Sequence, residues 1–191
     1  MSTTTPDRGG RPASTSAHEL AAVAQELFVE RGFDETSVDD IAAAAGISRR
    51  TFFRYFSTKA DVLWVESPTE LATFRDLLAG SSDPWREALC ACAPQALHHP
   101  AEQRRWMLHR AELLLTVPAV QEKAAIRHAQ WREIATAFVT ARGLPSLVAV
   151  AAGHAVLAAT LGAHEYWIAH PDEDLPTLHG RFLAMFLAGV G

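Results

Sequence analysis

The sequence predicts an all-α protein, with an N-terminal helix-turn-helix domain followed by a larger C-terminal helical domain. Three observations lead to this prediction. Apolar residues recur at helical spacing, capping-box patterns with Pro or Gly mark helix ends, and no stretch shows the alternation of a β-strand. A chain of 191 residues, of which 49% are hydrophobic and 20% charged, is long enough to build a proper core.

The helix-turn-helix domain begins with a helix expected from His18 to Arg31, where apolar residues share one face and Gly32 ends the helix. Residues 37–40 then form a capping-box pattern, a hydroxyl residue followed three positions later by an acid, which marks a new helix start. A short helix over Ile41–Ala45 follows. Gly46 supplies the left-handed residue that ends this helix.

The next helix mixes rings with cations in the stretch GISRRTFFRYFSTKADV, residues 46–62, and Ser48 is placed to cap it. On a helical wheel the three Phe residues at positions 52, 53 and 56 gather on one side, which we expect to be buried. The opposite side is cationic and carries hydroxyls; it holds Arg50, Thr51, Arg54 and Tyr55. Taken alone, these charges would also suit a solvated surface helix. Two short helices joined by a Gly turn, however, predict a helix-turn-helix whose second helix enters the DNA major groove.

The C-terminal domain is predicted from further helix starts and from its prolines. A capping box at residues 58–61 opens a long helix. A second box at residues 67–70, with Pro68 at the first helical position, predicts that this helix kinks or restarts there. Prolines and loop residues bound the remaining helices, expected over Trp85–His98, Ala101–Thr116, Pro118–Arg142, Pro145–Ala169 and Leu175–Val190.

The predicted helix Pro145–Ala169 is apolar almost all round, so we expect other helices to cover it on every side. Its longest apolar run, Leu147–Ala163, is interrupted by His154 and Thr160 and is shorter than the roughly 20 residues that cross a bilayer. We therefore predict an interior helix. Small residues along it permit close approach of a neighbouring helix: Ala149, Ala152, Gly153, Ala159 and Gly162.

The run RGFDETSVDDIAAAAGISRRTFFRYFSTKADVLW, residues 31–64, resembles the DNA-binding domain of the TetR family of transcriptional regulators. It has that family's Gly-aromatic pair, its Ala-Gly-hydrophobic-Ser turn, its Thr and aromatics, and the Lys that opens a fourth helix. The stretches RRTFFRYF, AELLLTVPAVQ, AQWREIATAFV and EYWIAHPDEDL are similar to one actinobacterial branch, the regulators associated with mycofactocin gene clusters. The resemblance implies a DNA-binding domain over residues 17–60 and an effector-binding and dimerisation domain over residues 61–191.

The resemblance assigns DNA contacts residue by residue. Contacts to phosphates are implied for Ser37, Thr51, Tyr55 and Lys59, and contacts to base edges for Ser48, Arg49, Arg50 and Arg54. The chemistry agrees with this division, because Arg can bind guanine O6 and N7 with two donors, whereas a hydroxyl or a Lys mainly fixes register on the backbone. Many relatives have Tyr at position 53, so the Phe of this chain lacks one phosphate contact.

In this family the last two helices pair across a two-fold axis, which here implies a homodimer formed through Pro145–Ala169 and Leu175–Val190. A two-fold dimer presents two recognition helices one helical turn of DNA apart and reads a palindromic operator. The resemblance implies a repressor: effector binding shifts the helix over residues 59–80, separates the two recognition helices and releases the DNA.

A small hydrophobic effector is the implied ligand. The mycofactocin branch implies a long-chain acyl thioester of coenzyme A (acyl-CoA), whose phosphates would meet Arg104, Arg105 or Arg127. A drug or another metabolite is the alternative within the same class of regulator. Helical spacing places candidate pocket residues on the stripes of two helices, although a plain core with a snorkelling Arg would show the same spacing. The candidates are Trp106, Met107, Arg110, Leu113, Leu114, Trp131, Ile134 and Phe138.

No catalytic or metal-binding motif competes with this interpretation. The sequence has no Gly-rich phosphate loop, nucleophile elbow or candidate triad, so we expect no enzyme activity and no cofactor. Several histidines and acids could converge inside a bundle, but zinc-ligand spacings and Glu-x-x-His pairs are absent, so we expect no metal. A bundle enzyme or metal carrier with an incidental DNA-binding domain is the alternative from another class; its candidate ligands are His109, Glu112, His128, His154, His164 and Glu165.

Charge and termini complete the sequence predictions. The net charge of -5 argues against nonspecific coating of nucleic acid, but not against operator binding, because the cations are concentrated in one segment. Residues 1–16 lack the apolar core of a signal peptide and are interpreted as a disordered arm. The two cysteines, Cys90 and Cys92, lie too close on one predicted helix to pair, which fits a reducing cytoplasm.

Overall fold

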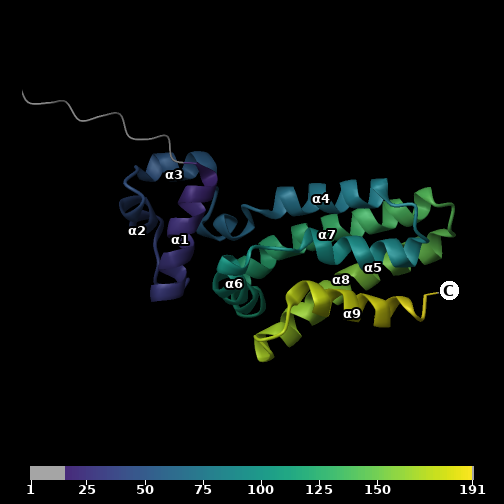
Figure 1. Cartoon of the computed structure of the whole chain (residues 1–191). Helices are drawn as coiled ribbons and strands as arrows, with labels where there is room; N and C mark the ends of the chain where they lie inside the picture. The colour runs from purple at the N-terminus through teal and green to yellow at the C-terminus, as the bar shows by residue number, and fades with distance from the viewer. Residues whose placement is uncertain (1–15, 191) are drawn as a thin grey trace, which may run out of the picture. The chain divides into compact units, whose positions relative to one another are not determined.

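The computed structural model describes residues 16–190, whose regular elements are all helices, with no β-strand among them (Figure 1). The predicted arm lies outside the described residues except for Ser16. Contacts divide the chain into two compact units, Met1–Val62 and Leu63–Gly191. The first unit contains α1 (Ala17–Arg31), α2 (Val38–Ala44) and α3 (Arg49–Tyr55), and the 3-10 helix η1 (Lys59–Trp64) spans the boundary. The second contains α4 (Ser67–Gly80), α5 (Trp85–Ala96), the 3-10 helix η2 (Ala101–Gln103), α6 (Arg104–Thr116), α7 (Pro118–Ala141), α8 (Ser146–Ala169) and α9 (Leu175–Leu187).

The helices of the first unit begin at capping residues that can be recognised in the sequence. Ser16 accepts a hydrogen bond from the Glu19 amide, so α1 begins one residue earlier than predicted. Ser37 caps α2 through the expected capping box, and Gly46 ends the turn after α2 with a φ of 65°, which confirms its left-handed role. The three helices close over side chains with no exposed surface: Leu20, Ala24, Phe28, Ile41 and Phe52.

The predicted helix after residue 58 is interrupted as expected, but its details differ. The Thr58 amide donates to the Asp61 carboxylate over 2.7 Å, yet η1 is a 3-10 helix and the regular helix α4 begins only at Ser67. The predicted cap at Ser67 is wrong. Glu66 precedes α4 in helical backbone geometry, with φ -82° and ψ -18°, and no side chain caps the helix. The Ser67 hydroxyl instead lies buried inside the second unit and has no hydrogen-bond partner within the part of the chain that the structure describes.

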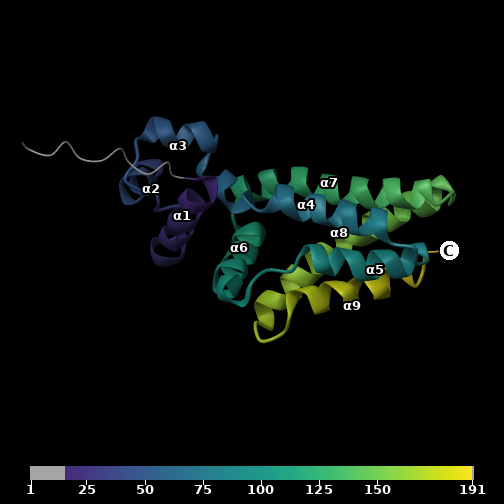
Figure 2. The same cartoon turned by 45° about the horizontal axis from the view of Figure 1, so that its top comes forward.

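The second unit is a helical bundle. Figures 1 and 2 show α4, α5, α7, α8 and α9 running lengthwise, with α6 across one end. The predicted helix over residues 101–116 is divided, because its first three residues form η2. In the main core the rings of Phe74 and Trp131 stack at 4.7 Å between centroids. Gly153 allows α8 to approach α7 closely, since a Cβ there would meet the Arg132 carbonyl oxygen at 2.8 Å as well as the Thr136 hydroxyl. The predicted close approach is confirmed at this position.

Helix α8 is not covered on every side by residues 16–190 of one chain, so the expected cover is incomplete within the monomer. Its exposed apolar side chains include Leu147, Val150 and Leu161, at 80%, 50% and 42% exposure, and α9 adds Met185 and Phe186. The helix is 24 residues long and contains an 18-residue window with a mean hydropathy of 1.7, so by length and composition alone it is a candidate membrane span, as core helices of soluble proteins also are. Other faces of α8 pack against α7 and α9, in the manner of a core helix.

Two histidines are buried beside Thr160 on α8. The Thr160 hydroxyl donates to the Val156 carbonyl at 2.9 Å and therefore accepts from His179 Nε2, 3.0 Å away. His164 Nδ1 lies 2.7 Å from the Thr160 carbonyl, to which it donates. Burial lowers the pKa of His164 to about 4 and that of His179 to about 3, so both rings are neutral at pH 7. The hydrogen bond from His179 to Thr160 links α9 to α8, whereas that of His164 stays within α8.

Candidate DNA-binding surface and effector site

The exposed side of α3 is a cationic surface. Arg50, Thr51, Phe53 and Arg54 line one open hollow on it. Ser48 caps the helix by accepting from the Thr51 amide at 3.1 Å, and the hydroxyls of these two residues lie 2.9 Å apart. The buried Phe52 ring holds the opposite side in the core. This arrangement presents guanidinium and hydroxyl groups along one short helix, as the sequence predicts for a helix that contacts DNA.

The three arginines of α3 differ in how they are engaged. Arg49 forms an ion pair of 2.7 Å with Asp39 on α2, and its guanidinium lies 5.3 Å from the centre of the Phe53 ring. Arg54 donates to the Tyr55 hydroxyl at 3.3 Å and covers that ring. Arg50 is exposed and has no partner among residues 16–190. Arg50 is therefore the α3 cation whose donors are most open to a base edge.

Phe53 does not lie on the buried side, which corrects the helical-wheel prediction. Its side chain is 44% exposed and meets the buried Phe52 ring edge-on at 5.5 Å, whereas Phe56 is buried as expected. The physical reason is the size of the helix. A helix of seven residues packs along a narrow stripe, and Phe53 is rotated by about 100° from Phe52.

Lys59 has a structural role that the sequence reasoning missed. Its ammonium donates to the carbonyl oxygens of Phe33, Asp34 and Thr36, at 2.6, 3.3 and 3.1 Å, and lies 4.4 Å from the centre of the Phe33 ring. All three N–H groups thus hold the loop between α1 and α2. The expected phosphate contact of Lys59 stays a prediction. The pattern around Lys59 describes only its own helix start and carries no signal for this contact.

Ser37 and Tyr55, the other expected phosphate contacts, stand at the ends of their helices. The Ser37 hydroxyl bonds to the Asp40 carboxylate, and hydrogen bonds from Ser37 lower the pKa of that carboxyl. Tyr55 is half-buried at the end of α3. Both keep oxygen atoms near the surface of the first unit, where a phosphate could be bound.

The predicted pocket residues separate into two groups. Trp131, Ile134 and Phe138 on α7 belong to the main core with Phe74, whereas Trp106 and Met107 on α6 belong to a second cluster around Trp167. The remaining three lie further along α6; Arg110 and Leu113 are buried and Leu114 is half-buried. The structure therefore does not gather the eight residues around one space.

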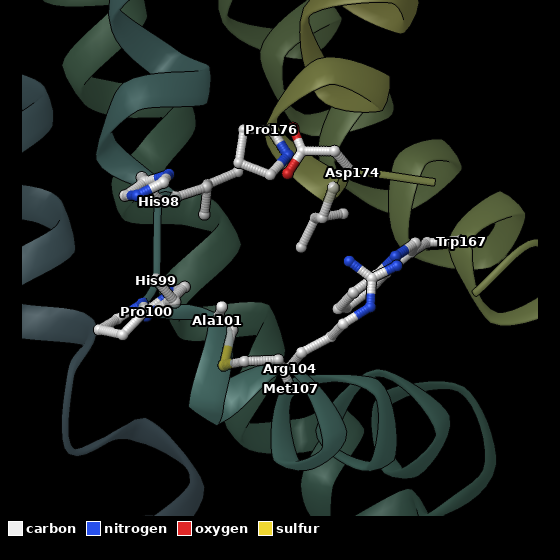
Figure 3. Close-up of a pocket in the computed structure, with 11 residues that line it drawn as sticks. His98, His99, Pro100, Ala101, Arg104, Met107, Trp167, Asp174 and Pro176 are labelled. Atoms are coloured by element: carbon white, nitrogen blue, oxygen red, sulfur yellow. The ribbon is translucent and has the colours of Figure 1, made fainter. Parts of the chain in front are cut away.

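A cavity of about 270 Å³ opens beside Met107, at the junction of α5, α6, α8 and α9 (Figure 3). Figure 3 shows the imidazoles of His98 and His99 on one side and Trp167 with Arg104 on the other. Leu97, Leu175 and prolines provide apolar walls. Sequence reasoning assigned Met107 and Arg104 to the effector site but missed the loop histidines and Trp167, which lie far apart in the chain.

Of the three cations expected near the pocket mouth, Arg104 is the one that lines this cavity. Its guanidinium donates to the carbonyls of Pro171 and Glu173 and lies 5.7 Å from the centre of the Trp167 ring, so it braces the turn between α8 and α9. Arg105 is exposed, and Arg127 reaches Gln130 at 3.5 Å. The structure does not bring the three into one anion site.

A buried polar cluster lies next to the cavity. Glu70 on α4 lies 3.0 Å from His99 Nε2 and 3.6 Å from an Arg110 nitrogen, although the His99 contact lacks hydrogen-bond geometry. Burial raises the pKa of the Glu70 carboxyl, but the opposing effect of Arg110 and His99 is larger. The pKa is therefore lowered overall, and the carboxylate stays ionised. Among residues 16–190 no three potential metal ligands gather; His109 and Glu112 form only a pair, at 3.6 Å.

Comparison with known proteins gives a consistent result. The protein-family model for bacterial regulatory proteins of the tetR family matches residues 20–63 of this chain. The family model for the MftR C-terminal domain matches residues 83–191. MftR of Mycobacterium tuberculosis, named for transcriptional regulation of mycofactocin biosynthesis, is 34% identical over 195 residues, which cover 96% of this chain and 94% of that protein. EthR of Mycolicibacterium smegmatis is 47% identical over 60 residues, 29% of this chain and 28% of that protein.

Solved structures show the same fold. FadR of Thermus thermophilus, a TetR family repressor in complex with lauroyl-CoA, superposes with a TM-score of 0.64 at 23% identity, over 92% of this chain and 95% of that one. SmeT, the repressor of the multidrug efflux pump SmeDEF of Stenotrophomonas maltophilia, superposes with a TM-score of 0.64 at 19% identity, over 93% and 94%. At these identities the likeness concerns the fold.

Proposed function

Because the chain belongs to the TetR family of bacterial regulatory proteins, whose members regulate transcription, we propose that it is a cytoplasmic repressor that binds a palindromic operator as a homodimer. We assign DNA binding to residues 17–60, and effector binding and dimerisation to residues 61–191. The observation that carries this proposal is the exposed cationic side of α3, where Arg50 is open to bases and Thr51 to phosphates.

The exposed apolar side chains of α8 and α9 support the homodimer. Side chains of this size are not normally left in water as a contiguous patch. A second copy of the same chain would cover Leu147, Val150 and Leu161 with the same residues across a two-fold axis. The same two-fold axis would relate two recognition helices, and so match a palindrome.

A long-chain acyl-CoA is the proposed effector, and it releases the operator. Support comes from the similarity to MftR, from the fold shared with a repressor that binds lauroyl-CoA, and from the partly apolar cavity beside Met107. To release DNA, the effector must bind the DNA-incompetent state more tightly. A hundredfold preference would shift the equilibrium by about 2.7 kcal/mol.

The test begins by selecting bound duplexes from a random pool and checking them for a palindrome. Operator affinity is then measured with acyl-CoA chains from two to eighteen carbons, beside a panel of drugs. Each added methylene should contribute about 0.8 kcal/mol until the cavity is filled, with matching changes in tryptophan fluorescence, because Trp167 lines the cavity. Long chains that bind and leave the operator complex intact would remove the acyl-CoA effector. A drug that releases the operator instead would establish the drug-sensing alternative.

A further inference from the structure

Three buried hydrogen-bond donors in the second unit have no acceptor among the described residues: the Trp64 indole N–H, the Ser67 hydroxyl and the Arg110 Nε–H. Their side chains are 6%, 1% and 4% exposed. A donor buried without an acceptor costs about 1 to 3 kcal/mol, so each such group in a native protein needs an explanation. They lie near the start of α4 together with one buried acceptor that also lacks a hydrogen bond among these residues, Glu70 Oε1. One such acceptor leaves at least one of the three donors without a partner, which points to an acceptor that comes from outside the chain.

The guanidinium of Arg110 lies beside the Trp64 ring and beside the face of α4 that carries Ser67. Its central carbon lies 5.6 Å from the centre of the Trp64 ring, and one nitrogen donates to the Leu63 carbonyl at 3.3 Å. Another nitrogen lies 3.6 Å from Glu70, which is one turn after Ser67 on the same face of α4. The three donors therefore lie near the start of α4.

The charges around these donors cancel. Glu70 is ionised and faces the Arg110 cation, while the buried His164, with a pKa lowered to about 4 by burial, is neutral. Burial and the nearby Arg110 also lower the pKa of His128 on α7. A ligand carboxylate would place a second negative charge beside Glu70 without a second cation, which is costly in a buried site. An uncharged carbonyl oxygen would accept the donors without that cost.

The surroundings also provide for an apolar chain. Leu71 and Phe74 follow on α4 and belong to the main core. Two residues connect the donors to the cavity of Figure 3: His99 lines the cavity and contacts Glu70, and Met107 lines it one turn before Arg110 on α6. A ligand that enters the cavity would reach the donors by passing the His99 and Met107 side chains, which lie between the two.

We propose that the effector is recognised through an uncharged carbonyl group, as in a thioester, ester or amide, whose oxygen accepts hydrogen bonds from Trp64, Ser67 and Arg110. The site selects such carbonyl compounds over carboxylates of the same chain length. This inference rests on the proposed function in one respect, that the second unit holds the effector. Its own content is the position of the carbonyl and the discrimination against the free acid.

The test uses three ligands with the same chain, methyl decanoate, decanoate and decane, titrated calorimetrically into the full-length protein. Methyl decanoate should bind at least about tenfold more tightly than decanoate. Ser67→Ala and Trp64→Phe should each weaken methyl decanoate about threefold to tenfold and leave decane unchanged, because only a hydrogen bond to the carbonyl is lost. Trp85→Phe is the matched control, since it truncates another buried indole of the second unit.

Tighter binding of decanoate than of its ester, or variants that weaken the ester and decane equally, would overturn the proposal. It is also overturned if a crystal structure shows an ordered water that holds all three donors and stays when methyl decanoate binds. Operator release is measured separately. If acyl-CoA fails to release DNA while the ester preference depends on Ser67 and Trp64, the proposed effector fails and the carbonyl site stands. If acyl-CoA releases DNA and neither variant changes the binding of the ester, the carbonyl site fails and the proposed effector stands.

Discussion

Replacing Arg50 with alanine should weaken operator binding without affecting the fold. The side chain is exposed and has no partner among the described residues, so its loss should change the free energy of unfolding by less than about 0.5 kcal/mol. A guanidinium bound to guanine through two donors contributes about 1 to 3 kcal/mol of discrimination, or roughly fivefold to 150-fold per half-site. Arg50→Ala should also relax the base preference at one position of each half-site.

The assay is fluorescence anisotropy with a labelled operator duplex at fixed salt, repeated with duplexes substituted at each half-site position. Salt must be fixed because phosphate contacts make affinity depend strongly on ionic strength. Arg105→Ala provides a matched control, since it removes an exposed guanidinium from α6. Equal operator affinity for the wild type and Arg50→Ala, with the same base preference, would refute the assignment of α3 as the recognition helix.

Four further predictions concern stability and assembly. Lys59→Met should lower the free energy of unfolding by about 1 to 3 kcal/mol in urea, because three carbonyls lose their donor; unchanged stability would contradict the structural role. Phe52→Ala should cost about 3 to 5 kcal/mol, and normal stability would mean that the buried side of α3 is assigned wrongly. Leu161→Glu should convert a dimer into a folded monomer by light scattering, and an unaltered mass would exclude this α8 face as the interface. His179 is neutral in the folded protein, with a pKa of about 3 against about 6.5 in the unfolded chain. Its contribution to the free energy of unfolding, up to about 5 kcal/mol, is therefore complete above about pH 6.5 and is lost as the pH falls toward 3. His179→Gln should flatten the fall in melting temperature between pH 7 and pH 4.5, whereas the exposed His98→Gln should not; an equally steep fall in both variants would exclude His179 as the cause.

Element boundaries were predictable because their causes are local. A cap such as Ser37 acts within three residues, and Gly46 adopts a backbone conformation that few other residues tolerate. Prolines likewise set the starts of α7 and α8. Most predicted helix ends therefore lie within a few residues of the observed ones. The cap at Ser67 failed because the backbone of the preceding Glu66 was already helical, which a residue pattern does not reveal.

The role of Lys59 could not be predicted, because its partners are distant in the sequence. The ammonium bonds to carbonyls 23 to 26 residues earlier, and the pattern around Lys59 describes only its own helix start. The exposure of Phe53 could not be predicted either. Helical spacing puts it near Phe52, but which part of an aromatic face is covered depends on the helices packed against it.

The candidate effector site was only partly predictable for a related reason. Trp131 and Phe138 have the spacing of a pocket lining, yet residues of the main core have the same spacing. Arg110 was singled out because an Arg on an apolar stripe is unusual, and it proves to be the centre of the buried polar cluster. Trp64 carried no signal and Ser67 carried only that of a helix cap, since their significance for a ligand lies in the absence of an acceptor among the described residues, which only a structure can show.

The exposed apolar face of α8 favours a second protein chain over a lipid bilayer as its cover. Leu147, Val150 and Leu161 fall within about 60° of one another on the helix, because they are separated by three and eleven residues. The same stripe contains the exposed His154 and Glu165, which would be expensive to place in hydrocarbon but can be hydrated or paired at a protein interface. The other faces of α8 are already occupied by α7 and α9, so no apolar surface surrounds the helix as lipid would require. A second copy related by a two-fold axis would bury one apolar stripe of α8, and α8 exposes one such stripe among the described residues.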